Sequence, residues 1–87
     1  MDLGLAGKAY LVTGASRGLG FATASELVAE GASVLIAARS EEDVATAASE
    51  LGCAGLSADL ADPSAAARLV SQTVASYGRI DGAVISV

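Results

Sequence analysis

Four short apolar runs are spread along the 87-residue chain, and a segment with helical spacing lies between each run and the next. Strands that alternate with helices of this length are joined by right-handed crossovers and form a parallel sheet. The pattern therefore predicts one α/β domain over residues 1–87, with the order β-α-β-α-β-α-β and the strand order 3-2-1-4. This is the N-terminal part of a doubly wound parallel sheet. The expected strands are residues 8–13, 33–38, 53–58 and 82–87.

The run at 33–38, SVLIAA, is expected to be a strand buried on both faces because it is apolar along almost its whole length. Three helices are expected around it, each packing one apolar side on the sheet and each followed by a glycine stop. They are residues 18–30 before Gly31, residues 40–51 before Gly52, and residues 62–77 before Gly78.

The sequence also predicts which residues begin the second and third helices and which residues of each helix face the sheet. Ser40 is the expected N-cap of the second helix, with three acids after it at the positive helix end. Asp62 is the expected N-cap of the third helix, with Pro63 as its first residue. The expected sheet-facing residues are Leu19, Ala22, Leu27 and Val28 in the first helix, Val44, Ala47, Ala48 and Leu51 in the second, and Ala66, Leu69, Val70, Thr73, Val74 and Tyr77 in the third.

Charge and composition exclude several classes of protein. The net charge is −5 with no basic run, so a nucleic-acid partner is not expected. No apolar stretch approaches about 18 residues, so no membrane span is expected. Cys53 is the one cysteine, and with no histidine in the chain it is read as a small buried apolar residue rather than a nucleophile. No metal site is expected, and a reducing, cytoplasmic compartment fits.

The last apolar run, GAVISV, is expected to form an edge strand without a neighbour. A bare apolar edge is an aggregation hazard. We therefore expect that a C-terminal half of the protein, or a complementing chain, covers this edge.

The stretch TGASRGLG, residues 13–20, lies where the first strand ends and the first helix begins. A helix N-terminus at such a junction offers unpaired N–H groups and the positive end of the helix dipole to a phosphate. Gly14 is expected to make the turn, Gly18 to let a pyrophosphate approach the backbone, and Gly20 to let the helix pack closely on the strand. The alternative is a glycine-rich turn that holds no ligand.

TGASRGLG resembles the T-G-x-x-x-G-x-G fingerprint of the short-chain dehydrogenase/reductase family. The resemblance extends over the whole chain, through ADL at 58–60 to YGRIDGAVISV at its end. It implies a Rossmann-type fold and hydride transfer between a nicotinamide cofactor and a small-molecule alcohol or carbonyl substrate. It also implies a homo-oligomer. Asp59, in the Asp59–Leu60 pair, would accept from the adenine amino group.

The arginines indicate which cofactor is bound. The second strand ends in Ala38-Arg39-Ser40, so it lacks the acid that usually meets the ribose hydroxyls of NAD. Arg39 and Arg17 can pair with a 2′-phosphate, with the hydroxyls of Ser16 and Ser40 as further donors. In the family, basic residues at these two places accompany NADP. The alternative is that both arginines are solvated loop charges.

The chain departs from the family pattern at its end and in its catalytic residues. The family's fourth strand usually ends in N-N-A-G, whereas here it reads Ile85, Ser86 and Val87. The backbone carbonyl of Ser86 could still meet the nicotinamide ribose. The family's catalytic Ser and Tyr-x-x-x-Lys are absent, and the one lysine, Lys8, precedes the first strand. No catalytic residue is therefore assigned, and the chain alone is expected to be inactive.

The cofactor-binding residues expected from the sequence are Gly14, Ser16, Arg17, Gly18, Leu19, Gly20, Arg39, Ser40, Asp59, Leu60 and Ser86. We favour the NADP-binding part of an oxidoreductase. A non-enzymatic dinucleotide-binding or sensor module is one alternative, and a methyltransferase is another. The absence of an acid at Ala38 argues against the methyltransferase.

Overall fold

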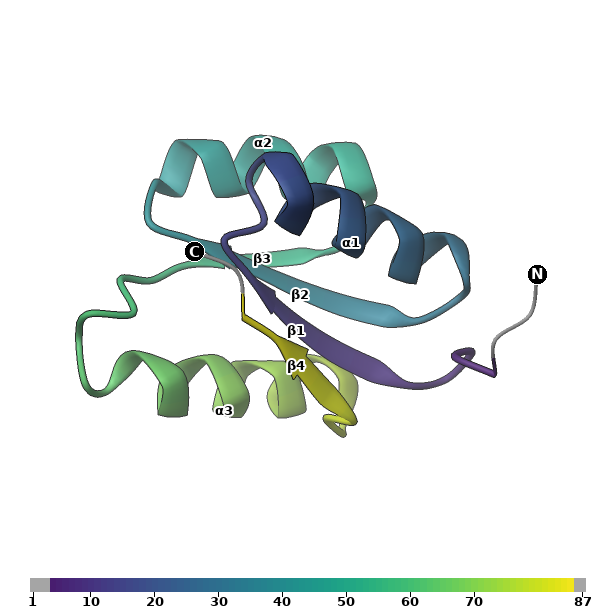
Figure 1. Ribbon diagram of the computed structural model, residues 1–87. Helices are drawn as coiled ribbons and strands as arrows, with labels where there is room; N and C mark the ends of the chain where they lie inside the picture. Colours follow the sequence, from purple (N-terminus) through teal and green to yellow (C-terminus); the bar gives the residue numbers. More distant parts are fainter. Residues whose placement is uncertain (1–3, 86–87) are drawn as a thin grey trace.

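The computed structural model describes residues 4–85, which form a four-stranded parallel sheet with helices on both faces (Figure 1). The strand order is β3-β2-β1-β4, and every pairing is parallel, as predicted. The elements are β1 (Ala9–Thr13), α1 (Gly18–Ala29), β2 (Ser33–Ala38), α2 (Glu41–Leu51), β3 (Ala54–Ser57), α3 (Ala65–Tyr77) and β4 (Gly82–Val84).

The core consists of two layers, one on each face of the sheet. α1 and α2 cover one face and α3 covers the other (Figure 1). Side chains along β2 alternate between the layers, so Val34 and Ile36 pack under α1 and α2 while Leu35 and Ala37 pack against α3. All four are almost completely buried. The prediction that this strand is buried on both faces is confirmed.

The sheet-facing side of α1 differs from the prediction. Leu19 is 79% exposed and Ala22 is also exposed, whereas Gly20 and Ala24 are buried. The helix carries apolar residues on most of its surface, so its spacing alone does not single out one side. The helix lies so close to the strands that its smallest residues face them. Leu27 and Val28 do pack against the core, as expected.

The start and the packing side of α3 also differ from the prediction. The helix begins at Ala65 with Ser64 as its N-cap, two residues after the expected start at Pro63. Asp62 instead accepts hydrogen bonds from both the N–H and the hydroxyl of Ser64, each at 2.9 Å, which holds a turn before the helix. The buried side is Ala65, Leu69 and Thr73.

Of the α3 residues that were expected to face the sheet, some consequently lie in the core and others lie on the surface. Ala66 is exposed, and Val70 and Val74 are each 41% exposed. The remaining helix signals are as predicted. Gly52 and Gly78 end α2 and α3 in the left-handed conformation, and Ser40 accepts the N–H of Asp43 at 3.2 Å.

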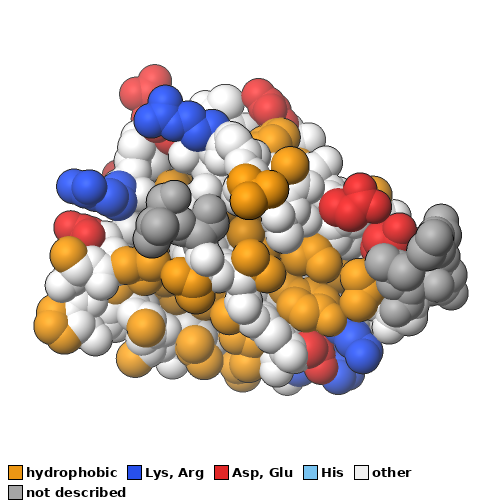
Figure 2. All heavy atoms as spheres, in the orientation of Figure 1, with side chains coloured by type: hydrophobic (Ala, Val, Ile, Leu, Met, Phe, Trp, Pro, Cys, Tyr) orange, Lys and Arg blue, Asp and Glu red, His pale blue; other side chains and the backbone are white. Residues whose placement is uncertain are grey.

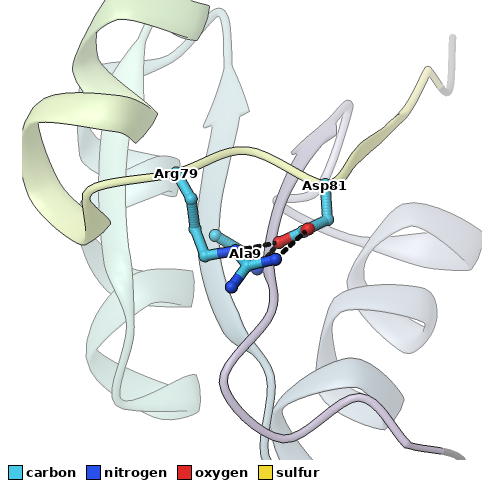
Figure 3. Close-up of polar contacts among 3 residues, drawn as sticks. All are labelled: Ala9, Arg79 and Asp81. Carbon is cyan, nitrogen blue, oxygen red and sulfur yellow. Dashed lines mark hydrogen bonds and ion pairs between the residues drawn. The ribbon is translucent and has the colours of Figure 1, made fainter.

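Two side chains lock the sheet at the edge where its strands begin. The hydroxyl of Tyr77 donates to the Val34 carbonyl at 2.6 Å and accepts the Ala54 N–H at 3.3 Å, so it joins β2 to β3. The Asp81 carboxylate accepts the Ala9 N–H at 2.8 Å and pairs with Arg79 (Figure 3). The Arg79–Asp81 contact is bidentate, with Nη2 of the arginine at 2.6 Å.

Replacing Tyr77 with phenylalanine is expected to lower the free energy of unfolding by about 1–3 kcal/mol, because the Val34 carbonyl and the Ala54 N–H lose their partner. Urea unfolding of the purified protein measures the change. Tyr10→Phe is the matched control, since the Tyr10 hydroxyl makes no hydrogen bond within residues 4–85. Equal stability of Tyr77→Phe and wild type would contradict the bridging role.

Asp81→Asn is expected to flatten the loss of stability in acid. The hydrogen bonds from Arg79, and then the one from the Ala9 N–H, hold the pKa of Asp81 below its ordinary value of 3.8. The carboxylate therefore stabilises the fold above that value, and this stabilisation is lost as the pH falls through the lowered pKa. The free energy of unfolding, measured from pH 7 downward, gives the slope for each variant. A slope as steep as that of wild type or of the exposed control Glu26→Gln would rule out the linkage.

Candidate functional site

Three turns meet at the edge of the sheet where the parallel strands end. β1, β2 and β3 all finish at this edge, so the turns after them lie next to one another (Figure 1). The Ala15 N–H donates to the Ala37 carbonyl at 3.2 Å, and the Ala58 N–H donates to the Ala38 carbonyl at 2.9 Å. These bonds extend the ladder into the turns. The site residues predicted from Gly14 to Leu60 all lie here, whereas Ser86 lies outside the described residues.

The glycines of the turn have distinct steric roles. Gly14 and Gly18 both have φ of 64°, in the left-handed region that favours glycine. A Cβ on Gly20 would overlap the carbonyl oxygen of Gly14, so α1 can reach this position only without a side chain. A Cβ on Gly18 would meet nothing within 4 Å, and open space therefore lies beside its backbone.

The N-terminus of α1 lacks the groups that normally satisfy a helix start. Arg17 is its N-cap residue in an extended conformation, and no side chain caps the helix. Its first turn contains no acidic residue. The N-terminus of α2, at the same edge, is capped by Ser40 and followed by three acids, Glu41 to Asp43. Of these two helices, α1 is the one that offers N–H groups and a positive dipole end to an anion.

Two of the turns at this edge each contain an arginine. Arg17 lies in the glycine turn and Arg39 directly follows β2, and both side chains are exposed. Neither forms an ion pair within residues 4–85, where the one ion pair joins Arg79 to Asp81. Ala38, at the end of β2, supplies no carboxylate. The edge therefore presents two available guanidinium groups near an open helix N-terminus.

The turn after β3 is held by Asp59. Its Oδ1 accepts the Ala61 N–H at 2.9 Å, and its backbone carbonyl accepts the Asp62 N–H at 2.9 Å. Asp59 thus has a structural role in the turn, while its Oδ2 makes no hydrogen bond or ion pair within the described part of the chain. Leu60 beside it is 42% exposed, and Leu19 is the most exposed large apolar residue of the edge.

A shallow cavity lies between the glycine turn and α2, with a volume of about 180 Å³. Sequence reasoning did not connect the α2 side chains here to Arg17, although their spacing of four residues along a helix is a readable signal. The residues that line the cavity are Ser16, Arg17, Glu42, Asp43, Thr46, Ala47 and Glu50.

Other chemistry-bearing groups lie elsewhere. Lys8 and Cys53 precede β1 and β3, so they lie at the opposite edge of the sheet, and burial raises the pKa of the Cys53 thiol. Tyr77 is used in the bridge between β2 and β3. Within residues 4–85 no group of three or more His, Cys, Asp or Glu is placed to hold a metal ion. None of the helices described there is long and apolar enough to cross a membrane.

Gly20→Ala is expected to destabilise the protein more than Gly52→Ala. The new Cβ at position 20 overlaps backbone atoms of the turn, which cannot rotate away as a side chain can. A Cβ at Gly52 meets nothing within 4 Å. The free energy of unfolding of that variant is therefore lowered only by the cost of its left-handed φ, about 1–2 kcal/mol. The midpoint of urea unfolding gives both values. A smaller effect at Gly20 than at Gly52 would show that the turn can shift away from the helix.

Comparison with known proteins places this arrangement in a family. The sequence profile of the short chain dehydrogenase family matches residues 8–87. An uncharacterized oxidoreductase of Mycobacterium tuberculosis is 38% identical over 79 residues, which are 85% of this chain and 30% of that protein. L-xylulose reductase of Mesocricetus auratus is 42% identical over 82 residues, which are 93% of this chain and 32% of the reductase.

A solved structure agrees with these relatives. The crystal structure of a short chain dehydrogenase from Mycobacterium smegmatis matches with a TM-score of 0.90 and 31% identity, covering 94% of this chain and 36% of that chain. The chain thus spans 30–36% of the length of these three proteins. Its strand order, its glycine turn and these matches agree, and the chain belongs to the short chain dehydrogenase family.

Proposed function

We propose that this chain is the NADP(H)-binding part of an oxidoreductase that transfers hydride between a nicotinamide and an alcohol or carbonyl substrate. The observation that carries the proposal is the uncapped N-terminus of α1 with Arg17 and Arg39 beside it. Family membership supports a nicotinamide dinucleotide, and the two arginines favour the form with a 2′-phosphate.

The glycine turn fits a pyrophosphate. The space beside Gly18 is open, and the first N–H groups of α1 have no side-chain cap. A dianionic bridge there would receive backbone hydrogen bonds and the favourable end of the helix dipole. The capped and acidic N-terminus of α2 offers neither.

The 2′-phosphate is assigned to the arginines and the adenine to the turn after β3. Ser40 uses an oxygen lone pair for the Asp43 N–H, which leaves its O–H as a donor toward the phosphate beside Arg39. The Oδ2 of Asp59 is available to the adenine amino group. The exposed Leu60 would flank the adenine ring, and Leu19 the open side of the glycine turn.

The names of the relatives support the class of chemistry. They include L-xylulose reductase, a 3-oxoacyl-[acyl-carrier-protein] reductase of Salmonella typhimurium, and a 2,5-dichloro-2,5-cyclohexadiene-1,4-diol dehydrogenase of Sphingobium indicum. When bound, the nicotinamide supplies or accepts the hydride. The residues of this chain hold and orient the dinucleotide, and the chain alone is proposed to be inactive.

The catalytic Ser, Tyr and Lys are assigned to polypeptide beyond these residues, in a cytoplasmic homo-oligomer. The exposed face at β4 and α3 supports a covering partner. Ile85 is 63% exposed, Val84 is 36% exposed, and β4 pairs only with β1 among the described strands. Figure 2 shows hydrophobic side chains gathered over the lower half of this view, where α3 and β4 lie.

NADPH is expected to bind at least tenfold more tightly than NADH, and Arg39→Ala is expected to remove most of that difference. A charge-assisted hydrogen bond contributes about 1.5–3 kcal/mol, which corresponds to about tenfold to a hundredfold in affinity. Calorimetric titration of the full-length protein with both cofactors measures it. Arg68→Ala is the control, because it removes the same charge from α3 on the opposite face.

Two results would contradict the proposal. Equal affinity of the wild-type protein for NADPH and NADH would remove the role of the arginines. A preference that survives in Arg39→Ala as fully as in Arg68→Ala would assign the phosphate to another place.

A further inference from the structure

The cavity between the glycine turn and α2 brings Arg17 together with several carboxylates. Ser16 and Arg17 line it from the turn, and three acids line it from α2. Glu42 and Glu50 lie eight residues apart on one helix, with Thr46 midway between them, so all three share one side of α2. The third acid, Asp43, lies in the first turn beside Glu42.

Arg17 faces these acids without pairing with them. No carboxylate within residues 4–85 lies within 4.0 Å of its guanidinium, since the one ion pair there joins Arg79 and Asp81. The described structure provides no other cation along the cavity. The acids are thus close enough to share a cavity with Arg17 and too far to neutralise it by contact. Charges that share a cavity act on one another without direct contact, and dissolved salt screens this interaction.

These charges bear on the proposed cofactor, and the following inference rests on the proposed function. A 2′-phosphate held by Arg17 would be a dianion beside the cavity that Glu42 and Glu50 line. The carboxylates would repel the phosphate and attract the guanidinium toward the cavity. A cofactor with a plain 2′-hydroxyl carries only the pyrophosphate, which both cofactors share, so the carboxylates oppose it less.

We infer that Glu42 and Glu50 limit the discrimination between NADP(H) and NAD(H) by opposing the 2′-phosphate across the Arg17 cavity. They are specificity-determining residues that do not touch the cofactor. Asp43 shares the cavity, but its backbone N–H takes part in the Ser40 cap, so its replacement would also disturb the start of α2.

The test compares Glu42→Gln, Glu50→Gln and the double variant in the full-length protein, titrated with NADPH and NADH by calorimetry. Each single variant is expected to bind NADPH about threefold more tightly, and the double variant about tenfold, with a smaller gain for NADH. The gain should shrink as the salt concentration rises toward 1 M. Both side chains are exposed, so the folded structure tolerates the amide.

Glu26→Gln is the matched control. Glu26 is exposed on α1, eight residues after Gly18, and does not line the Arg17 cavity. Its replacement changes the net charge equally and is expected to leave the NADPH affinity within twofold of wild type.

The outcomes separate this inference from the proposed function. Unchanged or weaker NADPH binding in the Glu42 and Glu50 variants overturns the inference, and so does an equal gain in Glu26→Gln. The proposed function still stands in those cases if wild type prefers NADPH and Arg39→Ala loses the preference. If the wild-type protein shows no preference for NADPH, both the inference and the proposed function are contradicted.

Discussion

β1 is hydrogen-bonded along both of its sides, and the rest of the molecule takes its position from this strand. β2 pairs with it on one side and β4 on the other. The register places Thr13, the last residue of β1, opposite Ala37. Arg39 follows Ala37 by two residues, so it lies close to the glycine turn that begins at Gly14. Because side chains alternate along a strand, a slip of one residue would turn the apolar side chains to the wrong faces. The distance between the glycine turn and the arginine therefore depends on this ladder.

The sheet could be predicted from sequence because its signals are local. SVLIAA is apolar over almost the full length of β2, and the observed bounds, Ser33–Ala38, are the predicted ones. The side of α1 that faces the sheet could not be predicted, since apolar residues occur around most of that helix and close packing selects Gly20 and Ala24. Before α3, Asp62 accepts hydrogen bonds from Ser64 in a turn and does not cap the helix. A short polar side chain can form either a turn or a helix cap, so the sequence alone did not decide between them.

The sequence predicted that the candidate site residues follow the strand ends, and it did not predict the interactions among them. The fingerprint at 13–20 identified the glycines, and the structure adds the steric reason for Gly20, which lies against the Gly14 carbonyl. The spacing of Glu42 and Glu50 places them on one side of α2, but no local pattern encodes that this side faces Arg17, because that depends on how α1 and α2 lie relative to each other. The same applies to Asp81, whose bond to the Ala9 N–H joins residues 72 positions apart.

That separation has a consequence for the order in which the chain can assemble. During synthesis β1, α1 and β2 leave the ribosome long before Gly82–Val84, so one side of β1 stays unpaired while residues 39–81 are made. α3 emerges before β4, and Leu69 from it packs against Leu11 and Leu35 on the sheet. This crossover helix can therefore shelter one face of the central strand before its last neighbour arrives. Newly made protein is thus most prone to wrong pairing in the interval between α2 and β4, and translation speed over residues 52–81 would affect its yield.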